Sequence, residues 1–253
     1  MNKKEKLFCY IQGMGDNALI LGHRLAELCG HGPALEIDMA LSNISLDLLG
    51  QTRSYFQYGA TLGIEEFNTE DSIAYSRDAR DFKNVLLVEQ PNEDFAYTIV
   101  RQFLFDSYHY LFLHELQNSK DKTLKAIAEK SIKEVAYHLR FSSQWMKRMG
   151  DGTEVSHEKM QTALNDLWDY RGELFVPTDI EQEMADKGIG VEVSAFKETY
   201  EKNIARIIEE ATLKIPESTW VQKGGKEGKH TEHMGYILSE LQWMQRAYPN
   251  MEW

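Results

Sequence analysis

The sequence has few of the features that mark secreted or membrane proteins. Its 253 residues include only two cysteines, Cys9 and Cys29, which cannot build a disulfide framework. No run of 18 apolar residues is present, so no membrane-spanning helix is predicted. The first residues are polar and lack the apolar segment of a signal peptide. We therefore expect a cytoplasmic protein that does not insert into a membrane.

Positive charge is also scarce. The chain has 28 lysines and arginines against 40 aspartates and glutamates, which gives a formal net charge of -12. A chain this acidic is repelled by nucleic acids and by anionic membrane surfaces, so neither is an expected partner. A local basic patch that binds an anionic ligand is still compatible with this balance.

Strand patterns are absent and prolines are few, whereas helix-forming residues are abundant. There are five prolines, and no stretch shows the alternating pattern of a β-strand. The apolar spacing predicts four long helices, which are Asp16–Cys29, Leu35–Leu62, Glu93–Leu116 and Lys122–Met149. We predict one all-α domain over residues 1–253, with a four-helix bundle at about 16–149 and additional C-terminal helices at about 153–253.

Local signals predict where several helices begin and end. The glycines of Gly13–Gly15 are expected to end a short opening helix, and Asp16 to cap the next one. Ser156 is expected to cap a helix over residues 158–174, and Ser194 to start a helix that reaches residue 212. The glycine-rich segment Lys223–Lys229 is predicted to be a flexible, solvated loop before a last helix over residues 231–247.

The fourth long helix carries an incomplete metal-binding motif. A four-helix bundle holds two irons with Glu on two helices and Glu-x-x-His on the other two. The three-residue spacing places both ligands on one face of the helix. His138 is present, but Val135 occupies the position three residues before it, and an apolar side chain cannot bind iron.

Other acidic and imidazole groups lie at helical spacings. Asp106 and His109 form the best mid-helix pair, and Glu134 lies four residues before His138. Three further pairs are weaker, two of them in a turn and in a loop: His23 with Glu27, Glu154 with His157, and Glu227 with His230. The residues alone leave three interpretations open, which are buried polar networks, an adventitious metal and a working di-iron centre. We favour the first and predict no catalytic, cofactor-binding or metal-binding residue.

Several long segments resemble one known family. The segments are residues 36–51, 87–92 with Phe95 and Ala96, 138–141, 224–226 and 230–233. In these segments the chain is similar to the C subunits of ring-1,2-phenylacetyl-CoA epoxidase, and the likeness extends from Asp16 to Trp253. The resemblance implies a ferritin-like fold and a place in a bacterial multicomponent di-iron monooxygenase. In that family the A subunit holds the di-iron centre and binds phenylacetyl-CoA.

The resemblance implies a non-catalytic, structural subunit that supports the catalytic A subunit in a heterodimer and joins the other epoxidase components. No cofactor is then expected in this chain, because the di-iron centre belongs to the A subunit. An apolar interface is expected on the helix at 35–62 or at 95–112. A homodimer of the isolated chain is compatible with the sequence. Two alternatives remain: a stand-alone ferritin-like di-iron oxidase, and a CoA-binding module that uses Lys226 and Lys229.

Overall fold

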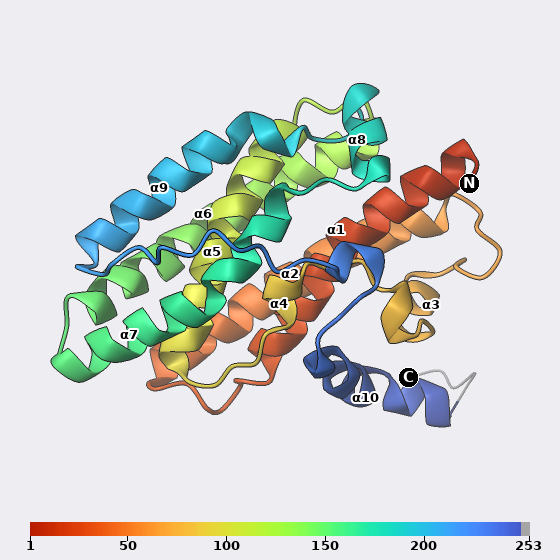
Figure 1. Cartoon of the computed structure of the whole chain (residues 1–253). Coiled ribbons are helices and arrows are strands. Elements are labelled where there is room, and N and C mark those ends of the chain that lie inside the picture. The colour runs from red at the N-terminus through yellow and green to blue at the C-terminus, as the bar shows by residue number, and fades with distance from the viewer. Residues whose placement is uncertain (249–253) are drawn as a thin grey trace. The chain divides into compact units, whose positions relative to one another are not determined.

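The computed structural model describes residues 1–248, and every regular element in this range is a helix (Figure 1). The predicted all-α, ferritin-like fold is confirmed. Two compact units are present: residues 1–89 with the segment from Gly224, and Gln90–Lys223. The single-domain organisation stays a prediction, and its last residues, 249–253, lie outside the described part. No helix in residues 1–248 is both long enough and apolar enough to cross a membrane.

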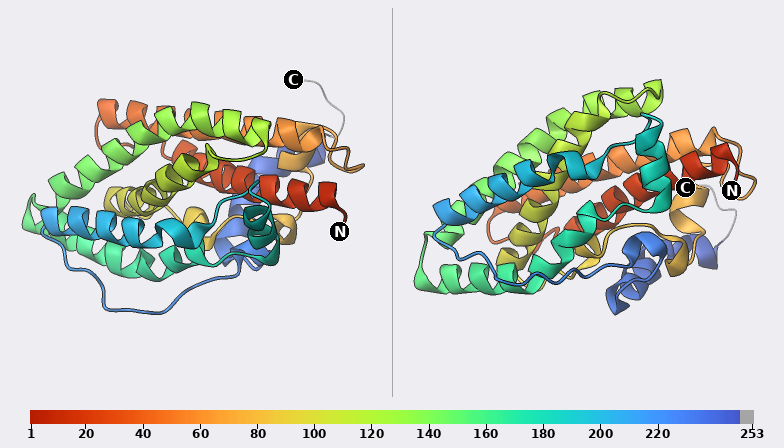
Figure 2. Two further views of the ribbon diagram at one scale, coloured as in Figure 1. Left: turned by 90° about the horizontal axis from the view of Figure 1, so that it is seen from above. Right: turned by 45° about the horizontal axis from the view of Figure 1, so that its top comes forward.

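The first unit is built on an antiparallel pair of long helices, α1 (Lys3–Ala26) and α2 (Leu35–Ala60), which lie side by side in Figures 1 and 2. The prediction that Gly13–Gly15 ends a helix is wrong, because α1 runs through it without a break. Gly15 serves packing instead: a Cβ at this position would lie 2.3 Å from the ring of Phe56 on α2. The glycine therefore allows the two helices to pack closely.

Asp16 is not the helix cap that the sequence suggested. It lies inside α1, is fully buried, and forms an ion pair with the buried Arg77. Arg77 donates to both carboxylate oxygens, at 2.9 and 2.5 Å, and the Lys83 amide donates to Oδ2 at 2.8 Å. The guanidinium also stacks 3.9 Å from the centre of the Phe82 ring. This fully bonded pair joins α1 to the segment that follows the short helix α3 (Glu70–Tyr75).

A second buried carboxylate fastens the C-terminal segment within the same unit. Glu89 ends the short helix α4 (Leu86–Glu89) and is fully buried. It accepts hydrogen bonds from Asn84 at 3.0 Å and from the amide and hydroxyl of Thr231 at 2.6 and 2.7 Å, and its Oε2 lies 2.7 Å from His230 Nδ1. Burial lowers the pKa of His230, but the hydrogen bonds to Glu89 and to the Phe82 carbonyl, together with the negative charges of Glu89 and Asp16, more than offset this, so the pKa is raised. Glu89 thereby anchors the start of α10 (Glu232–Ala247).

The glycine-rich segment is packed rather than flexible, so the prediction of a solvated loop is wrong for its glycines. Gly225 begins a 3-10 turn, η4 (Gly225–Glu227), and is buried. A Cβ here would lie 2.2 Å from the Asn84 carbonyl oxygen. Lys223 and Lys229 are exposed, and Lys229 pairs with Glu227 at 2.8 Å.

Gly225→Ala is expected to lower the free energy of unfolding by about 1–2 kcal/mol, because the added methyl group has no space against rigid backbone. Gly235→Ala is a matched control. Gly235 lies in α10, and a Cβ there would meet no atom within 4 Å. Alanine should therefore stabilise the helix by about 0.5–1 kcal/mol. Urea unfolding of both variants measures the difference, and an unchanged stability of Gly225→Ala would contradict this packing.

The second unit is built on the pair α5 (Phe95–Leu116) and α6 (Lys122–Gly150), whose bounds agree closely with the prediction. The helices α7 (Glu154–Leu167) and α9 (Lys197–Glu210) pack against this pair (Figure 2). The short helix α8 (Asp179–Asp186) begins at a capping box, in which the Glu181 amide donates to Thr178 Oγ1 and the Thr178 amide donates to the Glu181 carboxylate.

Two predicted helix starts in the second unit are wrong. Thr153, not Ser156, caps α7, and the helix gives way to a 3-10 segment, η2 (Trp168–Phe175), well before residue 174. Ser194 lies inside a 3-10 turn, η3 (Val193–Phe196), and α9 begins only after it, at Lys197. The 3-10 segments η2 and η3 adjoin α7 and α9 without a break in the apolar spacing. The spacing in the sequence therefore did not distinguish the 3-10 segments from the α-helices.

Candidate functional site

The buried polar groups of the second unit lie along the α5–α6 pair, and Asp106 is at their centre. Its side chain is fully buried. Gln102 Nε2 donates to Asp106 Oδ1 at 2.7 Å, and Ser142 Oγ lies 2.8 Å from Oδ2. Burial raises the pKa of Asp106 to about 8, although the two hydrogen bonds act in the opposite direction. The carboxyl group is therefore mostly protonated at neutral pH and can donate a hydrogen bond to Ser142.

Two histidines accompany Asp106 on the same pair of helices. His109 is one turn further along α5, and His138 lies on α6, where its carbonyl oxygen is 3.0 Å from Ser142 Oγ. Burial, and to a smaller extent the neighbouring His138, lowers the pKa of His109 to about 3. His109 is thus a neutral imidazole at every pH at which the protein is expected to work. Its Nδ1 has no hydrogen-bond partner among residues 1–248.

Val135 occupies the position where a bundle of this type needs a carboxylate. The side chain is completely buried in the apolar face of α6. Glu134, the nearest acidic residue in sequence, is only partly buried. The structure therefore brings together Asp106, His109 and His138 from the predicted pairs, and it does not bring Glu134 into the same buried face.

The remaining sequence-predicted pairs serve local structure. Glu27 binds Arg24 at 2.9 Å, while burial lowers the pKa of His23. His157 Nδ1 contacts the Gly150 carbonyl oxygen at 2.7 Å, beside the cap of α7. His230 contacts Glu89, as described above, and does not pair with Glu227. These contacts favour the interpretation of buried and local polar networks.

A di-iron centre does not fit the residues of this site. Two irons require several carboxylates that are ionised and free to bridge them. Here one carboxylate is replaced by Val135, and Asp106 is a protonated acid bonded to Gln102 and Ser142. Within residues 1–248, no three His, Cys, Asp or Glu side chains gather closely enough to hold a metal ion. What the site offers chemically is a neutral hydrogen-bond network that ties α5 to α6.

Comparison with known proteins identifies the family. The family model described as phenylacetic acid catabolic protein matches residues 1–253. The chain belongs to this family. It is also 47% identical, over 248 residues, to the C subunit of the 1,2-phenylacetyl-CoA epoxidase of Escherichia coli (strain K12). That alignment covers 98% of this chain and 99% of the relative.

Two members of the buried network around Asp106 were not found from the sequence. Gln102 and Ser142 carry no metal-binding or catalytic signature, so a search for ligand motifs passes over them. A signal was nevertheless present: Gln102 precedes Asp106 by four residues, within a helix in which most other positions are apolar. A polar pair at this spacing in a buried helix indicates mutual hydrogen bonding.

Proposed function

We propose that this chain is the C-type subunit of a phenylacetyl-CoA epoxidase and has no oxygenase chemistry of its own. The observation that carries the proposal is the 47% identity to the C subunit of such an epoxidase over almost the full length of both chains. Sequence identity confined to one domain or one motif would support only a shared fold. Identity along the entire chain also covers the surfaces through which a subunit meets its partners.

The interior of the second unit supports the non-catalytic part of the proposal. Oxygen activation by a di-iron enzyme needs a carboxylate-rich cavity between helices. Val135 fills part of that space with an apolar side chain, and Asp106 is held protonated by its burial. An apolar side chain at Val135 and a protonated acid at Asp106 make the interior of the helix pair rigid and unsuited to metal binding. Such rigidity suits a subunit that supports a catalytic neighbour.

The surface of α2 supports the existence of a protein partner. Leu35, Met39 and Leu46 are 71%, 57% and 65% exposed, and their spacing places them on one face of the helix. By contrast, four aromatic residues of α5, which are Phe103, Phe105, Tyr108 and Phe112, are buried in the core, and the other three are half-buried. Of the two helices that the sequence offered as interface, α2 is the one with strongly exposed apolar side chains, which supports it as the partner-facing helix. We name Leu35, Met39 and Leu46 the α2 stripe.

Co-expression with the catalytic subunit from the same organism tests the proposal. A tag on this chain should recover both proteins together, and the iron should remain with the catalytic subunit when the two are separated. Metal analysis of this chain alone should give well below one iron per chain. Two irons per chain, with epoxide formation in the absence of a partner, would overturn the proposal in favour of a stand-alone oxidase.

Conservative variants of the two buried histidines separate a structural role from a catalytic one. In His109→Gln and His138→Gln, the assembled complex should keep its iron content and its rate within a few-fold, because neither imidazole binds metal. Size-exclusion chromatography shows whether each variant still assembles. A variant that assembles fully and yet loses iron or activity would place the metal chemistry in this chain.

A further inference from the structure

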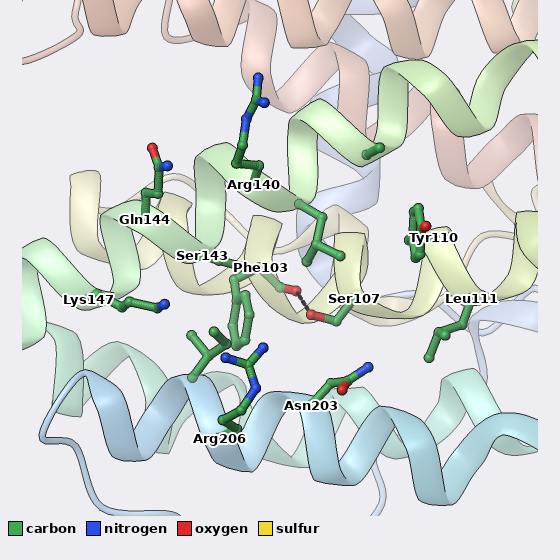
Figure 3. Close-up of a pocket in the computed structure, with 13 residues that line it drawn as sticks. Phe103, Ser107, Tyr110, Leu111, Arg140, Ser143, Gln144, Lys147, Asn203 and Arg206 are labelled. Atoms are coloured by element: carbon green, nitrogen blue, oxygen red, sulfur yellow. Dashed lines mark hydrogen bonds between the residues drawn. The ribbon is translucent and has the colours of Figure 1, made fainter.

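A groove in the second unit combines positive charge with an apolar wall. It has a volume of about 460 Å³ and lies between α5, α6 and α9 (Figure 3). This volume is within the range of about 300–1,000 Å³ that is common for small-molecule sites. All its residues belong to one compact unit, so the groove does not depend on how the two units are placed.

The charge of the groove is opposite to that of the whole chain. Arg140, Lys147 and Arg206 line it, and none of its lining residues is acidic. The chain as a whole carries a formal charge of -12. Three cations around one cavity on such an acidic protein concentrate positive potential at a single place, which attracts anions.

A carboxylate of the chain itself already binds two of these cations. Glu210 forms ion pairs with Lys147 and with Arg206, the latter at 2.6 Å. Hydrogen bonds from Lys147 and Arg206 hold the pKa of Glu210 below its usual value, so this carboxylate is ionised. Glu210 would therefore compete with a bound anion for Lys147 and Arg206. Its two ion pairs also demonstrate that these two cations can bind one anionic group together.

The cations lie beside an apolar surface. Figure 3 shows Lys147 and Arg206 extending toward the ring of Phe103 on α5, with Asn203 about one turn before Arg206 on α9. Leu111 and Leu139 line the same cavity and are half-buried, so they offer it apolar surface, whereas Phe103 and Ile207 are almost entirely buried, at 1% and 5% exposure. An anionic group held by Lys147 and Arg206 would bring any ring attached to it against this wall. A planar guanidinium also stacks well on an aromatic ring.

We propose that this groove binds a small organic anion that carries an apolar ring, with Lys147 and Arg206 holding the anionic group and Leu111 and Leu139 contacting the ring. Glu210 limits the affinity, because the ligand must displace its carboxylate. This site goes beyond the proposed subunit function and does not rest on it: the α2 stripe belongs to the other compact unit, and assembly with a partner is measured separately.

Fluorescence titration with 8-anilinonaphthalene-1-sulfonate, an aromatic sulfonate, tests the site on the full chain. Lys147→Gln and Arg206→Gln should each weaken binding by about five- to tenfold, the loss expected for one charge-assisted hydrogen bond. Glu210→Gln should strengthen binding by about threefold or more, since it removes the competing carboxylate. Lys133→Gln, an exposed cation on α6 outside the groove, is the matched control and should leave binding unchanged.

Displacement of the bound probe defines the ligand class. Phenylacetate should displace the probe. Phenylacetamide, which lacks the negative charge, and inorganic phosphate, which lacks the apolar ring, should each be at least about tenfold weaker. Equal displacement by phosphate, or by phenylacetamide, would overturn the assignment of an apolar anion. Binding that is unchanged in both Lys147→Gln and Arg206→Gln would place the probe elsewhere and overturn the site. Loss of partner binding without loss of probe binding in these variants would show a protein contact instead and also overturn it.

Discussion

Leu46→Glu is expected to abolish co-purification of this chain with the catalytic epoxidase subunit. The side chain is 65% exposed on the α2 stripe, so the variant should fold normally when isolated. In the assembled complex the new carboxylate would be buried without a partner, which is among the most unfavourable changes at an interface. We expect a loss of affinity of more than about 100-fold, as for a residue at the centre of an interface. Biolayer interferometry with the immobilised partner measures it.

A second variant on the same helix controls for the added charge. Gln57→Glu introduces the same negative charge on an exposed position of α2, and it lies about 16 Å along the helix from Leu46. It removes no apolar surface and should change the affinity by less than about threefold. Circular dichroism confirms the fold of both variants. Normal binding by a folded Leu46→Glu protein would show that the α2 stripe is not the interface.

The two long helices of the second unit could be predicted because their starts are marked in the sequence. Asp94 caps α5 and Asp121 caps α6, each by accepting hydrogen bonds from the first turn. The helix over Gly13–Gly15 could not be predicted in the same way. Glycine is locally a helix breaker, and the reason it is tolerated here is the ring of Phe56, which lies on another helix. Only the packed structure contains that information.

The charged interior was also beyond prediction from sequence. Asp16 and Arg77 are 61 residues apart, and Glu89 and Thr231 are 142 apart. Nothing in the local pattern indicates that these residues meet, because ion pairs are set by tertiary packing and not by spacing along a helix. The position of Asp16, directly after the segment Gly13-Met14-Gly15, favoured the helix-cap interpretation instead.

The candidate site was predictable in one respect and not in another. Val135 shows directly in the sequence that a carboxylate is missing, since a single position decides it. The protonated state of Asp106 depends on how completely the folded chain excludes water, and no sequence pattern reports this. The sequence therefore indicated a missing ligand, whereas the structure shows how the remaining acid is accommodated.

This protonated acid has a large expected effect on stability, which Asp106→Asn should reveal. In the unfolded chain the carboxyl group ionises near its ordinary pKa of 3.8, whereas in the folded chain the pKa is about 8. Between these pH values the folded protein holds a proton that the unfolded chain has released. The free energy of unfolding therefore falls as the pH rises from about 4 to about 8. Asparagine does not titrate in this range, so the free energy of unfolding of the variant does not fall for this reason as the pH rises.

The two proteins should differ little near pH 4, and the Asp106→Asn variant should be more stable by roughly 2–4 kcal/mol at pH 8. Asparagine keeps the network, because its carbonyl accepts from Gln102 and its amide donates to Ser142. Urea unfolding across this pH range measures the difference. Asp166→Asn, the same substitution at an exposed position, should stay within about 0.5 kcal/mol of the parent at either pH. A constant difference across the range, or a less stable Asp106→Asn protein at pH 8, would mean that Asp106 is ionised in the fold and that a basic partner holds it there.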